Sequence, residues 1–157
     1  MTAFARINTR QDAEQGAIWH VEFDSEPLFH EEKPIEMDFL GLESDVGRRA
    51  AAAMVRKMDK KSKGKRKAAS LSVQEMIDTA EDSEQARAEF YSKLCTGWRG
   101  VTYIEDKDLD DPEAEPVPME FSQANAAKLF STRSWLLVGI DDFLGDKSNF
   151  LREIVGS

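Results

Sequence analysis

Two short runs near the N-terminus alternate apolar and polar residues, and this pattern constrains the fold more than any other feature of the chain. A period of two places all apolar members of a run on one face of a β-strand. The segment between the runs, residues 24–34, contains two prolines and several acids, which is typical of a long turn. The apolar members of the two runs are Trp19, Val21, Phe23, Ile35, Met37 and Phe39.

Two antiparallel strands alone are marginally stable in water, so their apolar face must pack against helices. We therefore predict an α+β fold, with an N-terminal antiparallel β-hairpin or meander over residues 18–43 and a mainly helical body over residues 44–157. Residues 1–17 show no steady period and are predicted to form a flexible arm. The length of 157 residues fits one domain that needs no disulfide or metal to fold.

Helical spacing of apolar residues recurs along the body. Ser44 is a predicted N-cap for a helix whose apolar face includes Met54 and Val55. A capping box at Ser72 opens a second helical segment, which is predicted to end at Gly97. Its period slips near Asp82, which predicts a kink or two separate helices. Two further helices are predicted, over residues 123–130 after an N-cap serine and over residues 135–144 before a glycine.

The net charge of −9 hides a strong separation of charge along the chain. Residues 48–67 contain ten Lys or Arg and one acid, a local charge of +9, so the rest of the chain carries −18. Residues 60–70 are predicted to form a basic linker, because like charges and Gly64 disfavour a continued helix. Residues 105–118 contain seven acids and three prolines and are predicted to form an irregular acidic loop.

No motif for a catalytic nucleophile, a phosphate-binding loop or a dinucleotide-binding turn is present, so we predict no enzyme activity and no catalytic or cofactor-binding residues. His20 and His30 are interpreted as surface histidines, and the single Cys95 as a small buried apolar residue. No apolar run approaches the length of a membrane span, and the N-terminus lacks an apolar signal region. We therefore expect a soluble cytoplasmic protein that does not contact membranes.

The acidic loop resembles a calcium-binding loop only in part. Asp106, Asp108 and Asp110 match its first, third and fifth positions. Asp111 and Val117, however, occupy the positions where the turn needs glycine and the ion needs a bidentate glutamate. We therefore predict no metal ligands and interpret this segment as a solvated loop.

The helix predicted over residues 135–144 carries the candidate binding surface. Its apolar residues cover an arc of roughly 200° at about 100° per residue, whereas packing from one side needs a stripe of about 100°. The surplus predicts a contact with a partner helix or with a second copy of the chain, which would give a homo-oligomer. The alternative is that this helix lies at the centre of the core. The candidate partner-binding residues are Trp135, Leu136, Ile140, Phe143 and Phe150.

A series of short motifs in the C-terminal half follows a specific order. They are Gly97-Trp98-Arg99-Gly100-Val101, Pro116-Val117-Pro118-Met119-Glu120-Phe121-Ser122, Asn125-Ala126-Ala127-Lys128-Leu129-Phe130, the tryptophan helix Trp135 to Leu144, and Ser148-Asn149-Phe150-Leu151. In this order and spacing the sequence resembles the tail assembly chaperones of long-tailed bacteriophages. The acidic insertion at residues 106–115 departs from that pattern, because the family usually has a brief glycine-bearing turn there.

This resemblance implies a non-enzymatic phage tail assembly chaperone. Such a protein binds the tape measure protein and assists tail tube assembly, with the tail tube protein as a further candidate partner. It acts in the host cell cytoplasm and is absent from the mature virion. Two alternatives remain open: a structural tail or head–tail joining protein retained in the virion, and a nucleic-acid-binding module that uses residues 48–67. The second is disfavoured because no aromatic residues interleave with the basic residues and the remaining chain carries −18.

Overall fold

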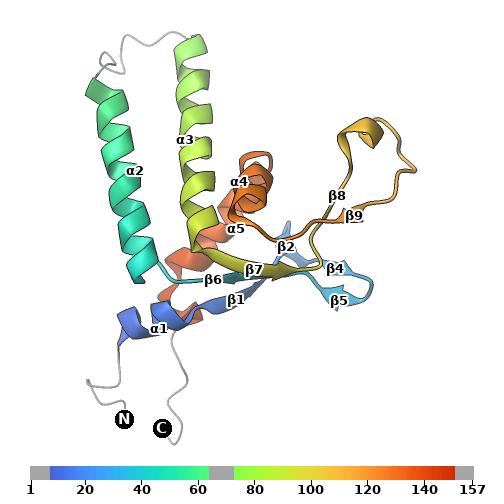
Figure 1. The fold of residues 1–157 in the computed structure, drawn as a ribbon, viewed down its shortest axis with the longest axis horizontal. Helices are drawn as coiled ribbons and strands as arrows, with labels where there is room; N and C mark the ends of the chain where they lie inside the picture. The colour runs from blue at the N-terminus through green and yellow to red at the C-terminus, as the bar shows by residue number, and fades with distance from the viewer. Residues whose placement is uncertain (1–7, 64–72, 151–157) are drawn as a thin grey trace, which may run out of the picture.

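The structure, a computed structural model, describes residues 8–63 and 73–150 and has the predicted α+β architecture (Figure 1). At its centre lies an antiparallel sheet in the order β1-β6-β7, formed by Ala17–His20, Glu36–Phe39 and Cys95–Arg99. The described helices are α1 Thr9–Gln15, α2 Asp45–Lys63, α3 Val73–Leu94, α4 Gln123–Ser131 and α5 Ser134–Gly145. Short two-stranded ribbons pair β2 Glu22–Phe23 with β3 Glu26–Pro27, β4 Phe29–His30 with β5 Lys33–Pro34, and β8 Thr102–Tyr103 with β9 Val117–Pro118.

The predicted apolar face of the N-terminal strands packs against the helices. Met37 and Phe39 are almost fully buried, and Trp19 and Val21 are buried as well. The Phe39 ring lies 6.3 Å from that of Phe130 in α4, measured between centroids. This confirms the period-two interpretation for four of the six residues, while Ile35 is half-buried.

Phe23 departs from this pattern and is 50% exposed. After Val21 the chain leaves the central sheet, and β2 pairs only with β3. The turn between them has positive φ angles of 54° and 65° at Asp24 and Ser25, which bends the ribbon as a two-residue hairpin turn does. The prediction that Phe23 faces the core is therefore wrong, because β1 ends at His20, three residues before the end of the alternating run.

The first 17 residues do not all form an arm. Asn8 caps α1 by accepting a hydrogen bond of 2.9 Å from the backbone of Gln11, and Ala13 is buried. The backbone N–H of Gly41 donates to Ala13 O at 2.9 Å, which fixes α1 beside the end of β6. A Cβ at Gly41 would lie 2.6 Å from that of Ala13, so this close approach requires glycine. Residues 1–7 of the predicted arm lie outside the described residues.

The two long helices α2 and α3 run side by side and extend away from the sheet (Figure 1). α2 continues to Lys63, so its last four residues belong to the segment 60–70 that was predicted to be a basic linker. Residues 64–70 of that linker lie outside the described residues. α3 is a single helix, so of the two predicted alternatives near Asp82, a kink or two helices, the second is wrong. α3 contacts three helices, α2, α4 and α5, so its apolar residues are not confined to one face.

α3 ends at Leu94, three residues before the predicted glycine stop. Cys95 to Arg99 instead add a third strand to the sheet, with Trp98 opposite Met37 and Arg99 opposite Glu36. Arg99 donates to both carboxylate oxygens of Asp38 at 3.0 and 2.8 Å across the exposed face of the sheet. The helical body predicted over residues 44–157 therefore contributes one strand to the N-terminal sheet.

The acidic loop extends from the β8/β9 ribbon and projects away from the body (Figure 1). Its described structure is a short 3₁₀ helix, η3, at Asp106–Asp108, with β9 at the last two positions of the predicted range 105–118. The rest is irregular, as predicted. The ribbon is anchored by the Trp98 indole N–H, which donates to Met119 O at 2.8 Å. A second 3₁₀ helix, η4 at Lys147–Asn149, follows α5.

Ser44 is the predicted N-cap of α2, and its side chain is fully buried. Its hydroxyl donates to Gly41 O at 2.6 Å and accepts from the Gly47 N–H at 3.0 Å. Ser44→Ala is expected to lower the free energy of unfolding by about 1–2 kcal/mol, because both backbone groups lose a buried partner. The exposed cap Ser122, whose hydroxyl accepts from Asn125 N–H at 3.0 Å, is the control. Urea unfolding measures both, and a larger loss for Ser122→Ala would contradict the argument.

Candidate protein-binding groove

An open groove of about 630 Å³ lies between the β2–β3 turn and helix α5. Its apolar surface comes from two parts of the chain that lie more than a hundred positions apart in sequence. Phe23 from β2 meets Trp135 from α5 edge to face, with 5.1 Å between ring centroids. Val138, one turn along α5, also lines the groove.

All three of these apolar side chains are exposed to solvent. The exposed fractions are 50% for Phe23, 38% for Trp135 and 56% for Val138. Single exposed apolar residues are common on protein surfaces, but a contiguous group in a concave site indicates a contact surface. The groove is therefore the described surface best suited to bind an apolar segment of another protein.

A glycine in α5 shapes the floor of the groove. A Cβ at Gly139 would lie 2.9 Å from Cζ2 of Trp19, closer than real carbon contacts allow. The absent side chain lets α5 approach the Trp19 ring, which then packs at 6.1 Å from Phe143. This close approach places Trp135 and Val138 beside β2.

Three carboxylates surround the apolar floor. Glu22 and Asp24 come from the β2–β3 ribbon, and Asp142 comes from α5. None of the three forms an ion pair with any residue in the described ranges 8–63 and 73–150. An apolar floor with an uncompensated negative rim favours a partner that carries both apolar and basic side chains.

Comparisons with protein-family models, with curated proteins and with solved structures find no match to this chain. Within the described part of the chain, no helix is long and apolar enough to cross a membrane. The same residues contain no group of three or more histidine, cysteine or acidic side chains that could hold a metal ion. The groove is therefore interpreted from its own geometry and charge.

The five predicted binding residues separate into two groups. Trp135 and Phe143 line the groove. Leu136 and Ile140 are 2% and 0% exposed, and Phe150 is buried against Phe143 with 5.4 Å between ring centroids. These three side chains therefore do not line the groove. Leu136 and Ile140 are buried where α5 packs against α3 and α4, and Phe150 is buried after η4.

Two groove residues, Phe23 and Val138, are not among the predicted binding residues. Phe23 was assigned to the core because it continues the alternation of the strand. Apolar spacing alone does not distinguish Val138 from its neighbours in α5, although it is the most exposed apolar side chain of that helix. Neither residue could be assigned to a groove before the two elements were placed together.

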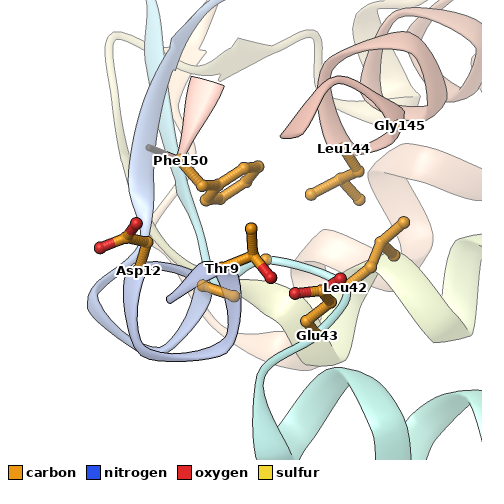
Figure 2. Close-up of a pocket in the computed structure, with 9 residues that line it drawn as sticks. Thr9, Asp12, Leu42, Glu43, Leu144, Gly145 and Phe150 are labelled. Carbon is orange, nitrogen blue, oxygen red and sulfur yellow. The ribbon is translucent and has the colours of Figure 1, made fainter. Parts of the chain in front are cut away.

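Phe150 lines a second, much smaller cavity of about 60 Å³ (Figure 2). Figure 2 shows its ring beside Leu144, with Thr9 and Asp12 of α1 and the Leu42–Glu43 segment around them. A space of this size holds at most a few water molecules. It is a packing gap between α1 and the end of α5, and the groove remains the candidate site.

The buried titratable groups lie in the core, away from the groove. Burial raises the pKa of Cys95 from 9.0 to about 12, in agreement with its interpretation as an apolar residue. Burial also raises the pKa of Tyr91 to about 12, helped by its hydrogen bond to the Asp141 carboxylate. His20 is not a free surface histidine, because its Nε2 lies 3.0 Å from Leu28 O and its ring meets Phe29 edge to face.

Both raised pKa values predict a loss of stability in alkali. The folded state retains protons that the unfolded state releases above pH 9–10, so the stabilisation is present below that range and is lost as the pH rises toward 12. The urea midpoint is expected to fall between pH 9 and 11. The double variant Cys95→Ala, Tyr91→Phe lacks both groups and is expected to show a shallower fall. Equal slopes for the two proteins would contradict this prediction.

Proposed function

We propose that the protein is a non-enzymatic phage tail assembly chaperone that binds an amphipathic helix of the tape measure protein in the groove between β2–β3 and α5. The observation that supports this most is the exposed apolar floor of Phe23, Trp135 and Val138 inside a carboxylate rim. An amphipathic helix buries its apolar face in a groove of this kind. The order of motifs from Gly97 to Leu151 supports the choice of partner.

The charge of the chain fits this role. A tape measure protein is long, apolar and helical, and it must stay soluble until tube subunits replace the chaperone. A chain with net charge −9 supplies solubility to the complex, while the groove supplies the apolar contact. The proposal includes action in the host cell cytoplasm, self-association and absence from the mature virion, with the tail tube protein as a further partner.

Co-expression with the tape measure protein of the same genome tests the proposal. Tagged wild-type chain is expected to recover the tape measure protein, and Val138→Asp is expected to reduce recovery at least tenfold by placing a charge on the apolar floor. Leu109→Asp is the matched control, because Leu109 is 64% exposed in the acidic loop and does not line the groove. A tape measure protein that stays soluble and builds normal tails without this chain would contradict the proposal.

The two alternatives from the sequence are separated by different measurements. A structural tail or head–tail joining protein would be found at fixed stoichiometry by mass spectrometry of purified particles, whereas a chaperone would be missing from them. A nucleic-acid-binding module would give a salt-dependent gel shift that weakens when Lys60, Lys61, Lys63 and Lys65 are replaced by glutamine.

A further inference from the structure

The outward face of helix α2 is the second exposed surface with apolar and charged character. At about 100° per residue, the residues that form this face lie within an arc of roughly 120° around the helix axis. Ala52 is exposed at the centre of this face, and Val55 is 55% exposed at one edge of it. The opposite side of α2, with the buried Ala50, packs against α3. The α2 outer face consists of Arg48, Arg49, Ala52, Val55 and Arg56.

The arginines of the α2 outer face are only partly neutralised. Arg48 and Arg49 share a single carboxylate, that of Asp45, at 2.9 and 3.1 Å. Arg56 donates to the backbone carbonyl of Ala52 and has no carboxylate partner among the described residues. The face therefore carries an apolar pair, Ala52 at its centre and Val55 at one edge, with the three arginines around them.

This arrangement is the converse of the groove, which is apolar on its floor and negative at its rim. We propose that the α2 outer face of one copy docks into the groove of a second copy of this chain. Val55 and Ala52 would lie on the floor formed by Phe23, Trp135 and Val138. The three arginines would face Glu22, Asp24 and Asp142, which have no ion-pair partner within the described chain. Opposite charges around an apolar centre provide both attraction and register.

The contact joins two copies because the geometry prevents it within one. α2 packs along α3, and its outer face points away from the body that carries the groove (Figure 1). The two surfaces are different patches, so the interface is head-to-tail. Such an interface either closes into a ring or continues as an open assembly. In an open assembly, each terminal copy keeps one unused surface.

Sedimentation velocity of the full chain tests the proposal. Wild type is expected to associate with increasing concentration at low salt, and the association is expected to weaken at high salt as the ion pairs are screened. Val55→Asp and Val138→Asp are each expected to weaken self-association at least tenfold. Both residues are more than half exposed, so both variants are expected to remain folded by circular dichroism. Leu109→Asp, at a third exposed site, is expected to associate as wild type does.

Mixing the two variants gives the decisive result. Val55→Asp retains an intact groove, and Val138→Asp retains an intact α2 outer face, so an equimolar mixture is expected to form pairs and nothing larger. A monomeric wild type at about millimolar concentration would overturn the proposal, as would wild-type association of Val55→Asp. A mixture that fails to pair would also overturn it, because it would indicate a symmetric contact.

This contact specifies the self-association included in the proposed function, and separate readouts distinguish it from binding of the tape measure protein. Val55→Asp leaves the groove unchanged, so it is expected to lose self-association and still recover the tape measure protein. Recovery of the tape measure protein by a strictly monomeric wild type would assign the groove to that partner and overturn self-docking. Self-association without recovery would contradict the chaperone proposal and leave the docking of α2 supported.

Discussion

Leu137→Asp is expected to unfold the protein, whereas the same substitution at the next residue, Val138, is expected to leave it folded. Leu137 is 1% exposed in the contact of α5 with the core, and Val138 is 56% exposed in the groove. An unpaired carboxylate at Leu137 is expected to cost more than about 4 kcal/mol, a large part of the stability of a typical domain. At Val138 the expected change is within about 0.5 kcal/mol, because the charge stays in water.

Circular dichroism and thermal unfolding compare the two variants directly. They carry the same new side chain in the same helix and have the same net charge. The helix propensities of the replaced leucine and valine differ by only about 0.5 kcal/mol, far less than the expected difference. Leu137→Asp is expected to lose cooperative unfolding. Retention of a folded state by Leu137→Asp would mean that α5 does not pack as described, and unfolding of Val138→Asp would remove the groove as an exposed surface.

Phe39→Ala is expected to give the largest loss among substitutions that only shorten a side chain. Phe39 is 1% exposed and lies at the meeting point of the sheet with α4 and α5. Its ring is within 6.4 Å of Trp19, 6.3 Å of Phe130 and 6.2 Å of Phe143, measured between centroids. Removing it leaves a cavity that rigid neighbouring rings fill poorly, so a loss of about 3–5 kcal/mol is expected.

Phe29→Ala is the matched control for this substitution. Phe29 is 57% exposed in the β4/β5 ribbon, and among the aromatic rings of the described residues it contacts only that of His20. Its removal is expected to cost about 1 kcal/mol or less. Urea unfolding at neutral pH measures both variants. A loss at Phe29 equal to that at Phe39 would show that the ribbon, and not the central sheet, carries the core.

Local patterns in the sequence predicted the elements that depend on neighbouring residues. The hydroxyls of Ser44 and Ser122 cap α2 and α4 as expected, because a cap needs only a backbone N–H three residues away. Alternation predicted the buried side of β1 and β6 because side chains on a strand alternate regardless of the partner. The acidic loop is irregular as expected, because prolines and like charges exclude regular structure locally.

Other features depended on contacts between distant segments, and these the sequence could not supply. Cys95–Arg99 became a strand because β6 offers it an open edge, which overrides the helical pattern leading into it. The apolar residues of the single helix α3 are not confined to one face because it contacts three helices.

The groove shows the same division between sequence and tertiary structure. The apolar arc of residues 135–144 indicated that α5 is covered on more than one side, and this follows from the sequence alone. Which residues of that arc are core and which are exposed was decided by where α3, α4 and β2 pack against the helix. Phe23 joins Trp135 and Val138 only because the chain leaves the sheet after Val21. A helix has one fixed arrangement of side chains, but its neighbours determine which of them remain in contact with water.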